Sequence, residues 1–589
     1  MRTLALALFC ATLYGQATYE LGPESQPQAN VPKGTVSRYT LAPGKYFPGT
    51  PHTYSVYVPA KYDAAKAAPF MIFLDGGGAL GNQQRVPVVS DNLIARGDLP
   101  PLIGIFIDPG VLPTLSSDHM NRFERIFEYD SISGRFAEFL VHELIPEVSK
   151  KHNLSKDPND RGIAGVSTGA VGAFIAAWNR PDQFRRVLSF IGTFVSMKGA
   201  DTLPALIRKS EPKPVRVFLQ AGRNDHIAPE HPYSTFYAGS WPMNNQVMQQ
   251  ALEYAGYDVK LVLGDEAHNM RHGAAIMPEA LRWLWREYPK PIVVREPAGM
   301  SKLGWDPRGA VFSIISSDKP WEQVGNTYPS ATSPAADKDG NVYFADPTTS
   351  RIYKSDANRA VTLFKDNTGG GRALRIGPDG RLYCSQLTRK RIVSYGASGD
   401  EKVVAQNVEA NDLALTAKGG IYFADTAHKT VGHIAANGQK RVVYDGGEIA
   451  MPTSLALSPD QSLLVVGDGM TKFSWSFQVA ADGSLINGEP YYRVDMAELS
   501  HASGVEGVAM DTEGYTYFAD ALGIQLCEQN GRCMQILSKP EMGALTGIAF
   551  GGKELNWLYV TEGGKLFRRA VKRSGAAAWN VVKPPRPPL

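Results

Sequence analysis

A turn followed by a strand recurs six times in the second half of the chain, and this repeat strongly constrains the fold. The copies begin at Asp339-Gly340-Asn341-Val342, Asp379-Gly380-Arg381-Leu382, Gly419-Gly420-Ile421-Tyr422, Asp460-Gln461-Ser462-Leu463, Glu513-Gly514-Tyr515-Thr516 and Asn556-Trp557-Leu558-Tyr559. Gly340, Gly380 and Gly420 are 40 residues apart. A period of this size built only from strands is typical of propeller blades, which must close into a ring to hide their edges. We therefore predict a six-bladed β-propeller over residues 326–573 and a Pro-rich tail at 574–589.

Residues 40–290 show a different pattern, in which short apolar strands alternate with helical stretches. This alternation is typical of a mostly parallel sheet covered on both faces. The expected strands are 53–58, 70–75, 102–107, 162–166, 187–191, 215–221 and 259–263, and the clearest amphipathic helix spans 132–151. A chain of 589 residues is too long for one core, so we predict a multidomain α/β plus all-β protein with a linker at 291–325.

The stretch Gly165-Val166-Ser167-Thr168-Gly169 places a serine on a strand-to-helix turn. An apolar run precedes it and a helix of small residues follows it. Flanking glycines let the strand and the helix approach closely, which forces the serine into a strained and exposed elbow. G-x-S-x-G alone is a weak signal, but this context predicts that Ser167 is a nucleophile.

A serine nucleophile needs a base and an acid, which in this kind of fold follow it in the order Ser, Asp or Glu, His. The predicted strand 215–221 ends just before Asp225, and the strand 259–263 ends just before His268. We therefore predict Asp225 as the acid and His268 as the base, in loops at the sheet edge where ligands gather. His226, His231 and His272 are alternative bases, and Glu230 and Asp265 are alternative acids.

An oxyanion hole requires two backbone donors. One is expected from the residue after the serine, Thr168. The other is expected from the Gly-rich loop after the second strand, Asp75-Gly76-Gly77-Gly78, and we choose Gly77. The alternative for this loop is an ordinary flexible turn.

Residues 50–288 resemble the esterase D-like, feruloyl and enterochelin esterase group of α/β-hydrolases. The motifs that carry the resemblance occur in the correct order: Phe73-Leu74-Asp75-Gly76, Arg125 with Glu128-Tyr129-Asp130, Phe139-Leu140-Val141-His142-Glu143-Leu144-Ile145-Pro146, the serine elbow, and Leu281-Arg282-Trp283-Leu284-Trp285. The resemblance implies an α/β-hydrolase domain that cleaves a carboxylic ester through an acyl-serine without a metal or other cofactor. Two departures are Ala170 in place of a second glycine and Glu266-Ala267 in place of Gly-Gly before the histidine; both should alter loop shape more than chemistry.

Residues 326–571 resemble the gluconolactonase and regucalcin family of six-bladed propellers, in Asn411-Asp412-Leu413, Leu457-Ser458-Pro459-Asp460 and Ala549-Phe550-Gly551-Gly552. That family holds a divalent cation in its central channel with Glu, Asn and Asp. The matching positions here are Thr332, Thr453 and Glu506, so only one keeps a charge. Hard cations need several oxygen ligands, preferably carboxylates, so we expect no metal and no working lactonase site. Asn411, Asp412 and Glu506 are expected to line a polar channel, although turn hydrogen bonds explain the first two equally well.

Composition and the N-terminus bear on partners and location. The net charge of +3 leaves no excess to neutralise a phosphate backbone, so nucleic acid is not an expected partner. Residues 1–17 have the charge-then-apolar order of a signal peptide, which predicts a secreted or periplasmic protein, and no later stretch is long enough to span a bilayer. Cys527 and Cys533 flank the turn signal Asn530-Gly531 and are either bridged or unpaired core thiols.

The function predicted from these observations is an exported serine esterase that cleaves a small-molecule, sugar or aromatic-acid ester. The propeller would then serve as a binding or positioning domain. Two alternatives stay open: a metal-dependent lactonase carried by the propeller, and a non-catalytic ligand-binding protein in which both sites are degenerate. The sequence does not define the oligomeric state.

Overall fold

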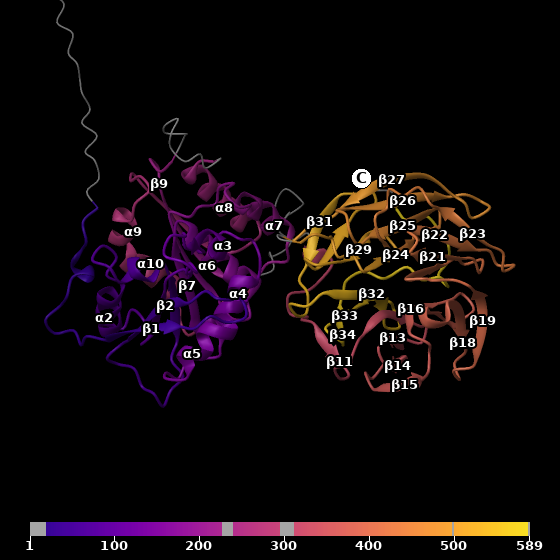
Figure 1. The fold of residues 1–589 in the computed structure, drawn as a ribbon, viewed down its shortest axis with the longest axis horizontal. Helices are drawn as coiled ribbons and strands as arrows, with labels where there is room; N and C mark the ends of the chain where they lie inside the picture. Colours follow the sequence, from indigo (N-terminus) through magenta and orange to yellow (C-terminus); the bar gives the residue numbers. More distant parts are fainter. Residues whose placement is uncertain (1–18, 227–238, 295–310, 498–499, 587–589) are drawn as a thin grey trace, which may run out of the picture. The chain divides into compact units, whose positions relative to one another are not determined.

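The computed structural model describes residues 19–226, 239–294, 311–497 and 500–586, and the predicted signal peptide at 1–17 lies outside these residues. The chain divides into two compact units. The first is an α/β unit that extends to Val294, and the second is a propeller unit that extends to Leu589 and also includes residues 209–211. The predicted combination of an α/β sheet and a six-bladed propeller is confirmed (Figure 1).

The α/β unit is built on an eight-stranded sheet. In spatial order its strands are β1 (Thr35–Leu41), β2 (His52–Val58), β4 (Ile103–Ile107), β3 (Phe70–Leu74), β7 (Arg161–Val166), β8 (Arg186–Phe190), β9 (Arg216–Gly222) and β10 (Asp258–Gly264). The six strands from β4 to β10 run parallel, whereas β1 and β2 pair antiparallel at one edge. Sequence patterns missed β1, whose side chains are mostly exposed and so leave no apolar run.

Helices cover both faces of this sheet. Alternate strand residues face opposite layers, as their period of two requires: Phe70 and Ile72 pack into one core and Met71 and Phe73 into the other. The first core includes residues of α4 (Arg135–Phe139), α5 (Ile145–Ser149), α6 (Thr168–Asn179), α7 (Leu203–Lys209) and α8 (Trp241–Tyr254). The second includes residues of α1 (Gly76–Leu80), α2 (Val86–Arg96) and α10 (Met277–Trp285). The remaining short elements are β5 (Val111–Leu112), β6 (Arg122–Phe123), α3 (Arg125–Tyr129) and α9 (Arg271–Ala275).

The amphipathic helix predicted at 132–151 is present, but a π-helical turn at Leu140–Leu144 lies between α4 and α5. Its apolar side chains Phe136, Phe139, Leu140, Leu144 and Val148 are all buried in the first core. The helix therefore serves as a cover for the sheet, as its apolar face indicates.

The propeller unit contains six four-stranded sheets, which are its blades. The strands that line its central cavities are β12 (Thr332–Ala336), β16 (Gly371–Ile376), β20 (Asp412–Leu415), β24 (Pro452–Leu457), β28 (Gly507–Met510) and β32 (Leu545–Gly551), here called the inner strands. The other strands are β13 (Val342–Asp346), β14 (Arg351–Ser355), β15 (Val361–Lys365), β17 (Leu382–Gln386), β18 (Arg391–Tyr395), β19 (Glu401–Gln406), β21 (Ile421–Asp425), β22 (Thr430–Ile434), β23 (Lys440–Tyr444), β25 (Leu463–Asp468), β26 (Phe473–Val479), β27 (Leu485–Arg493), β29 (Thr516–Ala519), β30 (Ile524–Cys527), β31 (Cys533–Leu537) and β33 (Trp557–Glu562), with the closing pair given below.

The ring closes by joining distant parts of the chain in one blade. Strand β11 (Glu322–Val324) pairs antiparallel with β34 (Lys565–Ala570), whose blade continues with β33 and β32. β11 lies in the segment that the sequence assigned to a linker, and Gly575 in the predicted tail bridges Asp511. This pairing covers edge strands that an open array would leave exposed.

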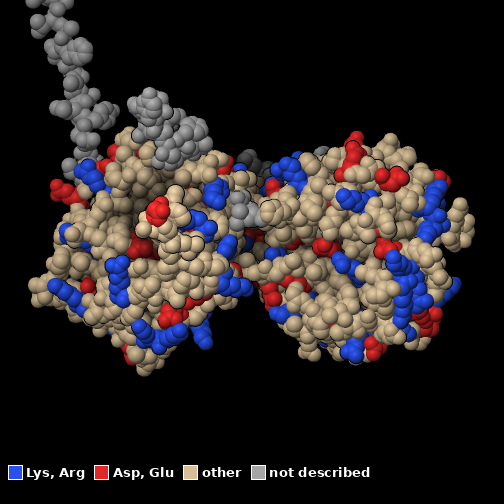
Figure 2. Space-filling model, in the orientation of Figure 1, with Lys and Arg blue, Asp and Glu red and all other residues tan. Residues whose placement is uncertain are grey.

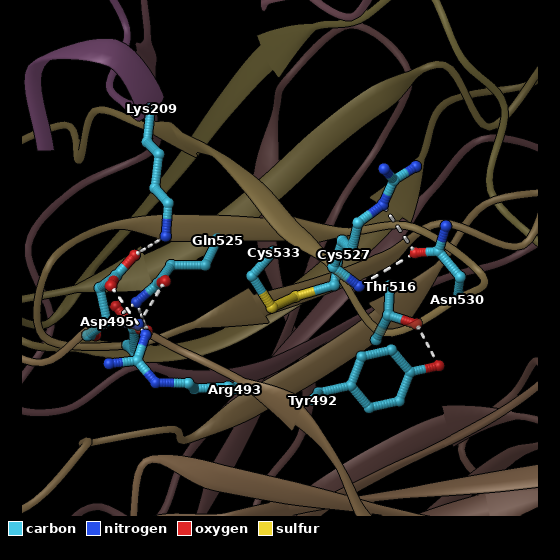
Figure 3. The surroundings of a disulfide bond; sticks show 11 residues. Lys209, Tyr492, Arg493, Asp495, Thr516, Gln525, Cys527, Asn530 and Cys533 are labelled. Carbon is cyan, nitrogen blue, oxygen red and sulfur yellow. Dashed lines mark hydrogen bonds and ion pairs between the residues drawn. A yellow bond between two sulfur atoms is a disulfide. The ribbon is translucent and has the colours of Figure 1, made fainter. Parts of the chain in front are cut away.

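Cys527 and Cys533 form a disulfide between β30 and β31 (Figure 3). The cysteines face one another across the hairpin whose turn contains Asn530 and Gly531. Of the two alternatives that the sequence left open, the structure has the bridged one.

Surface charge is mixed on both units. On the face shown in Figure 2, Lys and Arg side chains are interspersed with Asp and Glu side chains. Among the described residues, no helix combines the length and the apolar character needed to cross a bilayer.

Candidate functional site

Ser167 occupies a strained turn between β7 and α6. Its backbone has φ 57° and ψ −121°, a conformation that non-glycine residues rarely adopt. Gly165 makes the turn sterically feasible, because a Cβ there would lie 2.0 Å from the carbonyl oxygen of Gly169. The Ser167 side chain is half-buried at the carboxyl end of the parallel strands.

Three residues from separate loops meet at this turn. His268 Nε2 lies 2.9 Å from Ser167 Oγ, and His268 Nδ1 lies 2.9 and 3.0 Å from the two carboxylate oxygens of Asp225. Asp225 is fully buried, whereas the His268 side chain is 25% exposed. A carboxylate on Nδ1 favours the tautomer whose Nε2 accepts the Ser167 proton. The arrangement can therefore move a proton from the Ser167 hydroxyl to His268.

The alternative bases and acids lie elsewhere or outside the described residues. His272 is buried, and its Nδ1 lies 3.1 Å from Gln220 Nε2. Asp265 is exposed and forms an ion pair with Arg223 at 2.8 Å. Glu230 and His231 fall within residues 227–238, which are outside the described part of the chain.

Thr193 is a site residue that the sequence reasoning missed. Its Oγ1 lies 3.0 Å from Ser167 Oγ, and its amide donates to the Ser167 carbonyl at 3.2 Å. Because Ser167 has one hydroxyl proton and His268 accepts it, the network assigns Thr193 as the donor to Ser167 Oγ. Its place shortly after β8, at the same sheet edge, is the signal that could have identified it.

The two predicted oxyanion donors differ in their surroundings. Thr168 is the first residue of α6, where amide groups have no carbonyl partner within the helix. The Gly77 amide instead donates to the carboxylate of Asp108 at 2.8 Å. Asp108 follows β4 and was not foreseen. A substrate oxygen would have to displace this carboxylate to reach the Gly77 amide.

Arg125 ties the Gly-rich loop to the elbow. Its guanidinium donates two hydrogen bonds to Asp75, at 2.8 and 2.7 Å, and a third to the carbonyl of Val166 at 3.3 Å. Asp75 precedes the Gly-rich loop and Val166 precedes Ser167, so this one side chain holds both segments. Bidentate pairs of this kind add geometric specificity as well as energy.

Asp130 is a buried carboxylic acid close to the elbow. It is 1% exposed, and burial raises its pKa to about 7, although the charges of Arg125 and Lys198 and the hydroxyl of Thr168 act in the opposite direction. Between about pH 4 and pH 7 the folded protein therefore holds a proton that the unfolded chain has released. The contribution of Asp130 to stability falls as pH rises through this window.

We expect Asp130→Asn to remove this pH dependence. The free energy of unfolding of the variant, relative to the wild type, should rise by about 3 kcal/mol between pH 5 and pH 8, because only the wild type must bury a charge or retain a proton there. Urea denaturation at both pH values measures the difference. The exposed Asp201→Asn is the matched control. A difference that stays constant with pH would contradict the assignment.

The channel of the propeller holds ion pairs where the family resemblance placed a metal. A small cavity is lined by residues at or just before the starts of inner strands, among them Thr332, Arg372, Asn411, Asp412 and Glu506. Arg375 Nη2 donates to Asp412 at 2.7 Å, and Arg372 Nη2 donates to Glu506 at 3.1 Å. The predicted channel residues are therefore together, but both carboxylates already have guanidinium partners.

The neutral groups of the channel are also engaged. The hydroxyl of Thr332 donates to the Thr546 carbonyl at 2.6 Å, and that of Thr453 donates to the Val505 carbonyl at 2.5 Å. Asn411 donates to the Thr453 carbonyl at 2.7 Å. Asp412 accepts from the Leu455 amide of the next blade at 2.9 Å, so these residues join blades rather than make local turns. The residues present do not fit a divalent cation, which needs several free oxygen ligands.

We expect Arg375→Met to destabilise the propeller, because it leaves the Asp412 carboxylate, whose side chain is 6% exposed, without a counter-ion. The free energy of unfolding should fall by about 3 kcal/mol. Adding Asp412→Asn should recover most of this loss. Denaturation of the single and double variants measures the coupling, and equal stability of the two would contradict it.

A second cavity, of about 480 Å³, follows along the inner strands. It is lined by the later residues of these strands, including Ala414, Ala456 and Met510, and by part of the segment from Ala576 to Lys583. Arg375 lines both cavities, so it lies at the boundary between a polar and a more apolar chamber.

Comparisons with known proteins match each unit separately. Residues 47–277 match the family model described as "Putative esterase", and residues 330–564 match that of the SMP-30/Gluconolactonase/LRE-like region. A gluconolactonase of Zymomonas mobilis is 22% identical over 283 residues, covering 41% of this chain and 76% of the relative. An iron(III) enterobactin esterase of Dickeya dadantii is 24% identical over 205 residues, covering 32% of this chain and 42% of the relative.

Solved structures show the same likeness. A gluconolactonase from Xanthomonas campestris superposes with a TM-score of 0.40 at 18% identity, covering 44% of this chain and 93% of the other.

Proposed function

Since residues 47–277 form an esterase-family domain and residues 330–564 a gluconolactonase-like propeller, we propose that the chain is a serine esterase whose active site lies in the α/β unit. The observation that carries the proposal is the chain of short contacts from Asp225 through His268 to Ser167, at 2.9 Å on each side of the imidazole. The substrate class is a small-molecule, sugar or aromatic-acid ester.

The reaction begins when Ser167 Oγ attacks the ester carbonyl and His268 Nε2 takes the serine proton. Asp225 stabilises the imidazolium that forms, because it is a buried carboxylate on the opposite ring nitrogen. The Thr168 amide binds the developing oxyanion, and the Gly77 amide joins it when the substrate oxygen displaces Asp108. His268 then donates the proton to the leaving alcohol.

An acyl-serine remains after the alcohol leaves. Water, activated by His268 in the same way, attacks the acyl carbon and releases the acid. The strained backbone of Ser167 supports this role, since strain at an elbow keeps the hydroxyl exposed to the substrate. No step requires the propeller, whose channel charges are paired internally.

Covalent labelling tests the nucleophile. A fluorophosphonate probe should modify the full-length protein at Ser167, located by mass spectrometry of the labelled peptide, and a panel of aryl and sugar esters should be hydrolysed. Labelling at another residue, or no ester hydrolysis, would overturn the proposal. Hydrolysis of lactones that a chelator abolishes and Ser167→Ala leaves intact would instead place the activity in the propeller.

We also propose that the protein is exported. The Cys527–Cys533 disulfide supports this location, since disulfides persist in oxidising compartments. The order of charge and apolar residues in 1–17 points the same way. Fractionation of the producing cells tests it: recovery of the full-length, reduced protein in the cytoplasm would contradict export.

A further inference from the structure

A second histidine stands beside the candidate triad. His226 follows Asp225 directly, is half-buried, and its ring centroid lies 4.9 Å from that of His268. Trp241 contacts both rings, with centroids 4.9 Å from His226 and 5.4 Å from His268. The aromatic packing thus holds two imidazoles on one side of the buried Asp225 carboxylate.

These three side chains meet the basic requirement for metal binding. Ligand atoms of Asp225, His226 and His268 all lie within 4.8 Å of one another, and no other group of three His, Cys, Asp or Glu side chains meets this criterion among the residues that the structure describes. Tetrahedral zinc with bonds of about 2.1 Å separates its ligand atoms by about 3.4 Å. Side-chain rotation therefore has to draw the atoms together by only about 1 Å.

The chemistry of the three ligands selects the metal. Two imidazoles and one carboxylate suit zinc and similar transition metals, whereas magnesium and calcium prefer oxygen ligands alone. Three protein ligands leave a fourth position for water.

Metal binding and proton transfer compete for the same atoms. His268 Nδ1 is engaged by Asp225 and His268 Nε2 by Ser167, so a metal on either nitrogen removes one contact of the triad. If the metal takes Nε2, Ser167 loses its base. If it takes Nδ1, Asp225 no longer orients the ring.

We propose that zinc binds to Asp225, His226 and His268 and reversibly inhibits hydrolysis by withdrawing His268 from Ser167. The inference rests on the proposed esterase function for its consequence, but the metal site itself stands on the positions of the three side chains.

Hydrolysis of a p-nitrophenyl ester by the full-length protein tests the consequence. Zinc should inhibit the wild type, EDTA should restore the rate, and magnesium or calcium at the same concentration should have no effect. In His226→Asn, which removes one ligand, the half-inhibitory zinc concentration should rise by about tenfold or more, measured against the zinc-free rate of the same variant. His226→Phe, which keeps a ring against Trp241, should show the same resistance.

His142→Gln is the matched control. His142 also lies beside a carboxylate, 3.0 Å from Glu138, but has no place in the cluster, so this variant should keep the zinc sensitivity of the wild type. Equal inhibition of the wild type and both His226 variants would overturn the proposal, as would activation by zinc.

Cobalt binding separates the two proposals, because it needs no turnover. Addition of Co²⁺ to the wild type should produce visible absorption bands that zinc abolishes and that both His226 variants lack. Bands that depend on His226 without any ester hydrolysis would uphold the metal site and reject the esterase function. Hydrolysis without such bands would reject the metal site alone.

Discussion

Replacing Ser167 with alanine should lower kcat/KM for ester hydrolysis by about 10⁴-fold or more, because the variant has no oxygen to form the acyl intermediate. The remaining rate would come from substrate binding and the oxyanion donors alone. Steady-state assays with the preferred aryl ester measure the loss. The fold should persist, since Ser167 is half-buried and alanine is smaller.

The exposed Ser196→Ala provides the matched control and should keep the wild-type rate. Thermal unfolding of both variants should resemble that of the wild type, which separates a chemical effect from a folding defect. Full activity in Ser167→Ala would reject the serine mechanism, however well the triad geometry fits it.

Gly222→Ala should disrupt the site from a position that bears no functional group. Gly222 ends β9, and a Cβ there would lie 2.0 Å from the carbonyl oxygen of Glu266, two residues before His268. The loops are also joined by a hydrogen bond from the Asn224 amide to the same carbonyl, at 3.2 Å. An added methyl group must push the loop of Asp225 away from the loop of His268.

The expected result is a fall in kcat by about 10²-fold or more and a loss of about 2 kcal/mol or more in the free energy of unfolding. Enzyme kinetics and denaturation measure the two effects. Gly22→Ala is the control, because Gly22 has φ −66° and nothing within 4 Å of an added Cβ, and it should change neither. Normal kinetics in Gly222→Ala would mean that the contact between the loops does not hold Asp225 against His268.

Much of the fold follows from local patterns. The predicted strands agree with β2, β3, β4, β7, β8, β9 and β10 to within one residue at each end, because buried parallel strands appear as short apolar runs. The six turn-and-strand repeats correspond to six blades. β1 was missed since its exposed side chains carry no such run, and β11 was missed because a three-residue strand has no period of its own.

The candidate site was predicted only as far as strand order allows. Parallel strands bring their carboxyl ends to one edge, so Ser167, Asp225 and His268 were expected there, and the structure brings them together. Their catalytic roles stay predictions. Sequence order did not indicate the Thr193 contact to Ser167, or that Asp108 accepts the Gly77 amide, because both depend on side-chain direction in neighbouring loops.

The channel of the propeller illustrates the same division. The sequence showed that the metal ligands of the related family are missing at Thr332 and Thr453. It did not show what replaces their charge. Arg375 and Asp412 are 37 positions apart and Arg372 and Glu506 are 134 apart, and each pair meets only because closure of the ring brings separate blades to a common channel.

By itself, the sequence determined where strands and helices form, how many blades repeat, and which residue types with the required chemistry follow those strands. These properties depend on local period and turn residues, which act over a few neighbouring positions. Only the tertiary structure decided which titratable side chains meet, as for Ser167 and His268 across 101 positions of the chain. Contact over such a distance depends on how strands pack beside one another, and atoms must come within hydrogen-bond distance before chemistry can follow.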